Sequence, residues 1–264
     1  MSPRERLDSA VAARTGLTRS QARGLILAGR VRVDGQPAGK AGALLRTGAQ
    51  VEVETPPAYV SRGGDKLAGA LTAFGISPAG CDVLDVGAST GGFTDVMLAG
   101  GAKHVTALDV GYGQLAWKLR TDPRVTVIER TNFRTLRDDA FPQRFDLIVI
   151  DASFISLLTI AARSVAYLRP AGTIVALVKP QFEAGRQRLG GGGVVRDPEV
   201  HRAVLREVRD GLRTMGLTVV DAALSALRGP AGNSEFFYRI TNSGDPVDNA
   251  RLDALVDQAH AGEN

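Results

Sequence analysis

Four charged residues stand where the sequence predicts buried or half-buried backbone. Asp151 and Lys179 each end an apolar run with the pattern of a buried strand. Glu235 opens another apolar run after a turn rich in glycine, and Lys66 follows two glycines at the start of a helical pattern. Charges in such places are costly unless they are paired or used. A lysine beside carboxylates can act as a base or stabilise an alkoxide, although the four could equally form a structural ion-pair network.

The second feature with chemical meaning is a glycine-rich segment over residues 83–95, which reads VLDVGASTGGFTD. It begins as an apolar strand, turns at small residues and continues as a helical pattern. That order is the opening unit of a doubly wound α/β sheet, in which ligands bind at the carboxyl ends of the strands. Gly87, Gly91 and Gly92 let a ligand approach the backbone. The N-terminus of the helix that follows favours an anionic group.

The glycine spacing and two carboxylates favour S-adenosylmethionine over a dinucleotide. From Gly87 the sequence reads GASTGG, whereas the dinucleotide fingerprint is GxGxxG. Asp85, at the first strand end, is awkward for a pyrophosphate but suits a sulfonium or an amino group. Asp109 ends the next apolar strand, where a carboxylate can bind a ribose diol. Asn132 could bond an adenine edge beneath Phe133, or could belong to an ordinary loop.

The residues expected to bind the cofactor thus come from one sheet edge. They are Asp85, Gly87, Ser89, Thr90, Gly91, Gly92, Phe93, Asp109, Asn132 and Phe133.

The elements that must position these residues alternate between apolar strands and helical patterns. The expected strands are 83–86, 105–109, 125–129, 145–151, 172–179, 217–220 and 236–240, and the expected helices between them include 114–120, 157–168 and 200–215. Within the helix 114–120, Trp117 is expected to pack beside the ligand or on the sheet. Strands alternating with helices predict a parallel sheet.

Composition excludes several classes of protein. The chain has 264 residues, of which 44% are hydrophobic, enough for a packed core. One cysteine excludes an internal disulfide and a cysteine-based zinc site. The three histidines form no ligand cluster, so no metal is expected. No apolar stretch approaches the roughly 18 residues of a membrane span, and the N-terminus does not resemble a signal peptide. We therefore expect a cytoplasmic protein.

The basic residues are unevenly distributed. Residues 1–54 carry nine Lys and Arg but only five Asp and Glu, whereas the rest of the chain carries 23 of each. A basic segment on a near-neutral body suggests a polyanionic partner, above all nucleic acid. A merely solubilising surface is the alternative interpretation.

The same segment predicts two short helices and a small sheet, with Arg19 and Arg23 on one helix face. It resembles the small RNA-binding domain named after ribosomal protein S-four. The segments that carry the resemblance are 6–8 (RLD), 18–22 (TRSQA), 25–26 (LI), 29–31 (GRV) and 33–35 (VDG). The resemblance implies RNA docking through a basic face made of Arg4, Arg6, Arg19, Arg23 and Arg30. Arg30 could instead simply flank an exposed strand.

The larger part of the chain also resembles a known family. Lys66, Asp151, Lys179 and Glu235 occur in the order of the catalytic tetrad of FtsJ-like ribose 2′-O-methyltransferases. Several segments also resemble those of the TlyA, or hemolysin A, family, which joins such a domain to the same RNA-binding domain. The segments 60–67 (VSRGGDKL), 85–95, 151–156 (DASFIS), 178–183 (VKPQFE) and 232–237 (GNSEFF) carry it.

This resemblance implies an α/β fold, a doubly wound Rossmann-like methyltransferase sheet with a small N-terminal α+β RNA-binding domain. The expected parts are an RNA-binding domain over 1–54, a linker over 55–60 and an S-adenosylmethionine-dependent methyltransferase domain over 61–264. The implied reaction is methylation of a cytidine 2′-hydroxyl in ribosomal RNA of the large subunit, with the small subunit left open. Lys179 would be the central catalytic group, and Lys66, Asp151 and Glu235 would orient it and the ribose.

Three other functions remain open at the level of sequence. A non-catalytic RNA-binding assembly factor could keep the same fold. A membrane-lytic protein would fit the older family name, but the chain shows no basic amphipathic helix with a large apolar face. A dehydrogenase is opposed by the glycine spacing.

Overall fold

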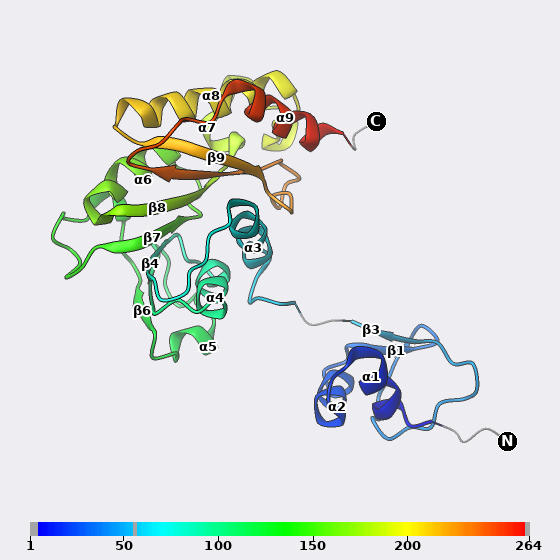
Figure 1. Cartoon of the computed structure of the whole chain (residues 1–264). Coiled ribbons are helices and arrows are strands. Elements are labelled where there is room, and N and C mark those ends of the chain that lie inside the picture. Colours follow the sequence, from blue (N-terminus) through cyan, green and yellow to red (C-terminus); the bar gives the residue numbers. More distant parts are fainter. Residues whose placement is uncertain (1–4, 55–56, 262–264) are drawn as a thin grey trace. The chain divides into compact units, whose positions relative to one another are not determined.

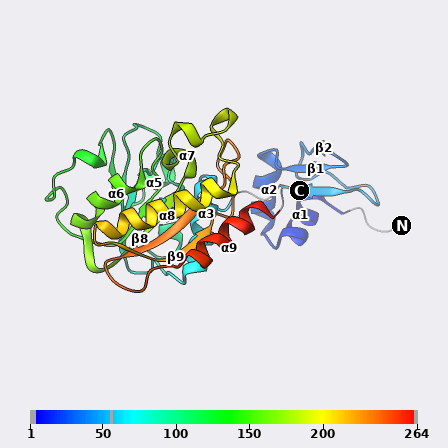
Figure 2. The ribbon, with the colours of Figure 1, turned by 90° about the horizontal axis from the view of Figure 1, so that it is seen from above.

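The computed structural model describes residues 5–54 and 57–261, which form two compact units divided between Pro57 and Ala58 (Figure 1, Figure 2). The division falls inside the segment 55–60 that the sequence analysis assigns to a linker. Tyr59 and Val60 pack against the core of the larger unit. The Val60 N–H also donates to the Asp95 carboxylate at 2.9 Å, which anchors this end of the segment to the larger unit.

The smaller unit consists of two helices and a three-stranded sheet. Its elements are α1 (Leu7–Thr15), α2 (Arg19–Leu27), β1 (Val31–Val33), β2 (Gln36–Pro37) and β3 (Val51–Val53), with the strand order β2-β1-β3. Helix α2 begins at Arg19, because Thr18 and Gln21 form a capping box there. Asp34 and Gly35 both have positive φ, as the tight turn between β1 and β2 requires.

A seven-stranded sheet forms the centre of the larger unit, in the order β6-β5-β4-β7-β8-β10-β9. The first five of these strands are parallel, and β10 is antiparallel to both of its neighbours. Because β5 and β7 lie on opposite sides of β4, the strand order reverses at β4, which is where doubly wound sheets bind ligands. The strands are β4 (Asp82–Val86), β5 (His104–Leu108), β6 (Val125–Ile128), β7 (Phe145–Ile150), β8 (Leu168–Val178), β9 (Thr218–Leu224) and β10 (Phe236–Thr241).

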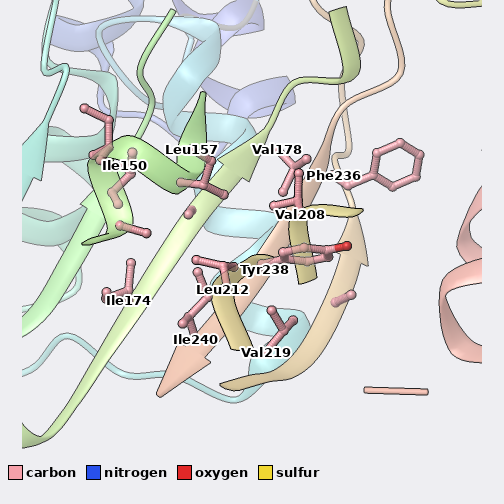
Figure 3. Packing of buried hydrophobic residues seen from close by; sticks show 14 of the residues in the cluster. Ile150, Leu157, Ile174, Val178, Val208, Leu212, Val219, Phe236, Tyr238 and Ile240 are labelled. Atoms are coloured by element: carbon pink, nitrogen blue, oxygen red, sulfur yellow. The ribbon is translucent and has the colours of Figure 1, made fainter. Parts of the chain in front are cut away.

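Helices cover both faces of this sheet, which confirms the predicted α/β fold (Figure 1). One face packs against α3 (Arg62–Phe74), α4 (Gly92–Ala99) and the short α5 (Trp117–Arg120). The other packs against α6 (Leu157–Ser164), α8 (Pro198–Thr214) and α9 (Asn249–His260). Figure 3 shows the second of these clusters, where Val208 and Leu212 of α8 meet Tyr238 and Ile240 of β10. A further short helix, α7 (Pro180–Glu183), follows β8 directly.

Several elements differ from their predicted bounds, and three of the differences bear on the site. The helix predicted over 157–168 ends at Ser164 and becomes a 3₁₀ turn, so that β8 starts at Leu168 instead of 172. The helix predicted over 114–120 begins only at Trp117, because Ala116, with a ψ of 139°, is not helical.

The predicted packing of Trp117 is also wrong, since this side chain is 75% exposed. Leu115 and Leu119 are the residues of this segment that face inward. They occupy the space above Gly91, where a Cβ would lie 2.8 Å and 2.3 Å from them. The opposite side of the segment, with Trp117, is left to solvent.

Phe237 links the sheet to the helix that follows the glycine turn. Its side chain is fully buried, and its ring centroid lies 6.1 Å from that of Phe93 in α4. We expect Phe237→Ala to lower the free energy of unfolding by about 3–5 kcal/mol, because it removes a fully buried ring and leaves a cavity. Phe237→Leu should cost less, since it keeps more of the volume. Urea titrations measure both, and an unchanged midpoint for Phe237→Ala would contradict this account of the core.

Candidate active site

Two cavities open at the carboxyl edge of the large sheet. The first, here called the lysine cavity, has a volume of about 420 Å³ and is lined by all four predicted charged residues, Lys66, Asp151, Lys179 and Glu235. The second, here called the Asp109 cavity, has a volume of about 460 Å³. The two cavities share a wall made of Gly87, Ser89, Asp151 and Ser153. A molecule in one cavity would therefore lie directly beside a molecule in the other.

Lys66 and Glu235 form a buried ion pair across the lysine cavity. Their Nζ and Oε2 atoms are 2.6 Å apart, although the residues are 169 positions apart in the chain. Only 9% of the Lys66 side chain and 1% of the Glu235 side chain are exposed. The second carboxylate oxygen of Glu235 accepts from Gln181 Nε2 at 3.3 Å. It also packs on the backbone of Gly229, where a Cβ would lie 2.5 Å from it, so this turn has no room for a side chain.

Lys179 and Asp151 form the second ion pair. Asp151 follows β7 and Lys179 follows β8, and these two strands are parallel neighbours, so their carboxyl ends meet. The Lys179 ammonium lies 2.5 Å from the Asp151 carboxylate and donates to the Ser153 hydroxyl at 2.9 Å. It also lies 5.9 Å from the ring centroid of Phe182. A desolvated lysine held in this way can stabilise a developing oxyanion or, when neutral, accept a proton.

Sequence reasoning missed Ser153. It contacts Lys179 and lines both cavities, so it lies at their junction. Its position two residues after Asp151 was the only signal available, and a serine in a loop has no pattern of its own.

Backbone groups hold the Asp109 carboxylate in the wall of the second cavity. It accepts hydrogen bonds from the N–H groups of Ser89 at 2.8 Å and Gly111 at 2.6 Å. Ser89 has a φ of 48°. Its hydroxyl donates to Gln114 Oε1 at 3.2 Å. Gln114 also lines this cavity and was missed by the sequence analysis. A carboxylate fixed by two N–H groups keeps acceptor capacity for a pair of hydroxyls.

The remaining predicted cofactor residues divide between the cavities. Asn132 and Phe133 line the Asp109 cavity, and Asn132 also caps a 3₁₀ turn by accepting from the Arg134 N–H at 3.1 Å. Thr90, Gly92 and Phe93 line the lysine cavity instead.

Close packing explains why glycine, and no larger residue, stands at positions 87 and 92. A Cβ on Gly87, whose φ is 86°, would lie 2.6 Å from the Asp151 carbonyl oxygen. A Cβ on Gly92 would lie 2.3 Å from Ser61 Oγ, at the start of α3. The two glycines thus allow β4 and α4 to approach the segments that carry Asp151 and Lys66.

Asp85 and Gly91 do not reach either cavity, unlike the sequence-based expectation. Asp85 is fully buried between β4 and α4, where one of its oxygens accepts from the Thr94 hydroxyl at 2.6 Å. Its other oxygen has no hydrogen-bond partner in the described part of the chain. Burial raises the pKa of this carboxyl to about 7. Asp85 therefore faces the core of the domain rather than a bound cation.

The predicted RNA-binding arginines lie on the smaller unit, except Arg4, which is outside the described residues. Arg6 donates to the buried Asp8 carboxylate at 3.0 and 2.7 Å, and Arg19 approaches it at 3.4 Å. These hydrogen bonds hold the Asp8 pKa well below its usual range. The side chains of Arg6 and Arg19 remain 49% and 61% exposed. Asp8 thus fixes two guanidinium groups that solvent still reaches. Arg23 is exposed and Arg30 is half-buried, and Asp8 contacts neither of them.

Residues 59–241 match the family model of the FtsJ-like methyltransferases, and residues 5–51 match the S4 domain. The chain belongs to the FtsJ-like methyltransferase family. It is 47% identical to the 16S/23S rRNA (cytidine-2′-O)-methyltransferase TlyA of Mycobacterium tuberculosis, over 98% of this chain and 97% of that protein. It is 40% identical to Hemolysin A of Brachyspira hyodysenteriae, over 83% of this chain and 92% of that protein.

A solved structure agrees with these matches. A Streptococcus thermophilus protein named as a hemolysin has 40% sequence identity and a TM-score of 0.76, covering 99% of this chain and 97% of that one. The predicted resemblance to the TlyA, or hemolysin A, family is confirmed, and the protein is a methyltransferase of the FtsJ-like type.

Two features are absent from the described residues. Within 5–54 and 57–261, no three or more His, Cys, Asp or Glu side chains are grouped so as to hold a metal ion. Over the same ranges, no helix combines the length and the apolar character needed to cross a bilayer.

The buried Asp85 predicts a pH-dependent stability. The unfolded carboxyl ionises near pH 3.8, whereas the folded one keeps its proton up to about pH 7. Between these values the folded state binds more protons, so the free energy of unfolding should fall as pH rises, by at most about 1.4 kcal/mol per pH unit. Urea titrations from pH 4 to pH 8 should show that Asp85→Asn removes this slope, whereas Asp139→Asn, on the surface, should keep it. A slope that persists in Asp85→Asn would show that other groups cause it.

Proposed function

We propose that this protein transfers a methyl group from S-adenosylmethionine to the ribose 2′-hydroxyl of a cytidine in ribosomal RNA. The observation that carries the proposal is the lysine cavity, where two lysine–carboxylate pairs lie beside a second cavity in an FtsJ-like sheet. The name of the M. tuberculosis relative gives the same reaction, at 47% identity over nearly the whole chain. That name includes both subunit RNAs, so we propose the large-subunit RNA as substrate and the small-subunit RNA as a second one.

The residues of the Asp109 cavity fit the cofactor. Asp109, fixed by two backbone N–H groups, would accept the two ribose hydroxyls. Asn132 and Phe133 would hold the adenine, and Gly87 and Ser89, in the shared wall, would lie along the rest of the molecule. Bound there, S-adenosylmethionine supplies an electrophilic methyl group.

Lys179 is the central catalytic group in this proposal. Its Nζ atom lies in the lysine cavity beside the shared wall, where it would lower the pKa of the 2′-hydroxyl or take its proton. Asp151 and Ser153 hold this nitrogen in place. Lys66 and Glu235 would orient the ribose from the other side of the cavity. Much of the rate would come from alignment of the hydroxyl with the methyl group.

The smaller unit would bring the RNA to this site. Arg6 and Arg19, held by Asp8, together with Arg4, Arg23 and Arg30, would bind phosphates without reading the sequence. We therefore propose that residues 1–54 act as the RNA-binding domain and residues 61–264 as the methyltransferase domain. A ribosomal RNA substrate also implies that the protein works in the cytoplasm.

Lys179→Ala tests the proposed chemistry. With tritiated S-adenosylmethionine and purified ribosomal subunits, the wild-type protein should label RNA, and alkaline hydrolysis should leave a resistant dinucleotide that begins with methylated cytidine. Lys179→Ala should lower the rate by about 100-fold or more, because proton transfer and oxyanion stabilisation are lost. The matched control is Lys103→Ala, since Lys103 pairs with Asp82 at the opposite end of β4. A wild-type protein that binds subunits without labelling them would instead support the non-catalytic alternative.

Arg19→Ala tests the proposed RNA contact. In a plot of log RNA affinity against log salt concentration, the slope should become shallower by about one, because one phosphate contact is lost. Filter binding at several salt concentrations measures the slope. Arg46→Ala, which removes an exposed arginine paired with Asp34 on the same unit, should leave the slope unchanged. Equal slopes for Arg19→Ala and the wild type would remove Arg19 from the interface.

A further inference from the structure

A short segment beside the two cavities exposes several large apolar side chains. Val110, Tyr112 and Trp117 are 69%, 66% and 75% exposed. Large apolar side chains left exposed within one short segment suggest an interaction site. We call Tyr112, Trp117 and the neighbouring Arg130 the aromatic rim.

The backbone of this segment is held in place. The Ala116 N–H donates to the Thr90 carbonyl at 3.1 Å, and the Arg130 N–H donates to the Gly111 carbonyl at 3.0 Å. The Gly113 N–H donates to the Glu129 carboxylate at 2.9 Å. With Leu115 buried beneath, the outward position of the rings follows from the fold and not from a loose loop.

One ring of the aromatic rim has a cation over it, and another cation follows the second ring in the chain. The Arg130 guanidinium carbon lies 4.0 Å from the centroid of the Tyr112 ring. Lys118, next to Trp117 in sequence, is 59% exposed and pairs with Asp95 at 2.9 Å. Exposed aromatic rings with adjacent cations suit nucleic acid in particular, because unpaired bases stack on the rings while the cations attract phosphates. An apolar protein partner would gain nothing from these charges.

The segment that carries the aromatic rim borders both cavities, but the rim itself lines neither. Thr90, which bonds the segment at Ala116, lines the lysine cavity, and Val110 and Gln114 line the Asp109 cavity. Tyr112 and Trp117 line neither cavity. Their rings therefore stay available when both cavities are filled.

We propose that Tyr112 and Trp117 stack on unpaired bases of the RNA substrate close to the nucleotide that enters the lysine cavity. The inference rests on the proposed function, because it assumes an RNA substrate. It assigns to the methyltransferase unit an RNA-binding surface separate from the arginines of the smaller unit.

The chain offers a direct test, since Trp117 is its only tryptophan. Fluorescence of the full-length protein thus reports on this one side chain, and a protein-free ribosomal RNA transcript adds no tryptophan signal. Addition of the transcript should lower the quenching of Trp117 by acrylamide. Trp117→Ala should weaken transcript binding about tenfold, as loss of one stacked base predicts, and Trp117→Phe should weaken it less.

Controls separate an RNA contact from a general defect. Trp117→Ala should keep the wild-type affinity for S-adenosylmethionine and the wild-type thermal unfolding measured by far-UV circular dichroism, because an exposed side chain leaves no cavity. Met215→Ala, which truncates a 41% exposed apolar residue just before β9, at the other edge of the sheet, should keep wild-type transcript affinity.

The outcomes distinguish this inference from the proposed function. If the transcript binds and is methylated while Trp117 stays fully accessible and Trp117→Ala binds normally, the aromatic rim is not an RNA contact and the proposed function stands. If Trp117 is protected but no RNA is methylated, the proposed function fails and the contact stands. If Trp117→Ala loses affinity only for intact subunits, the rim binds a ribosomal protein and the RNA assignment is overturned.

Discussion

The buried ion pair between Lys66 and Glu235 constrains the whole methyltransferase unit. Removing two charges from water costs several kcal/mol each, and only a close partner with further hydrogen bonds offsets that cost. The pair connects the start of α3 with the residue before β10, so the two ends of the domain must meet at one place. The backbone of Gly229 and the amide of Gln181 complete the surroundings of the Glu235 carboxylate. A single unpaired charge at this depth would be strongly destabilising.

The order of the strands brings the charged residues to one edge of the sheet. Asp151 and Lys179 follow the adjacent parallel strands β7 and β8, and Glu235 precedes β10, which runs antiparallel beside β8. All three side chains therefore reach the same edge. Gly87, at the end of β4, lets the Asp151 backbone approach so closely that the two cavities share a wall. The fold thus places side by side the two cavities that the proposed function assigns to the RNA ribose and to the methyl donor.

In the smaller unit, too, a buried carboxylate holds cationic side chains in place. A buried carboxylate, Asp8, fixes Arg6 and Arg19, whose guanidinium groups stay partly exposed. Cations held by a carboxylate lose less side-chain entropy when they bind a phosphate than free ones do. In both units, therefore, a buried carboxylate positions the cationic groups that are proposed to act.

The sequence by itself determined the alternation of strands and helices, the glycine turn, the family and the four charged residues, because apolar periodicity and motif spacing are local properties. It did not determine where side chains point once the elements pack. Asp85 and Asp109 both follow the same pattern at a strand end, yet Asp85 is buried against Thr94 and Asp109 lines a cavity. Trp117 lies outside because Leu115 and Leu119 fill the space above Gly91. Ser153 and Gln114 became visible as site residues only when strands distant in the chain met, since hydrogen bonds between loops depend on tertiary distances that no local pattern encodes.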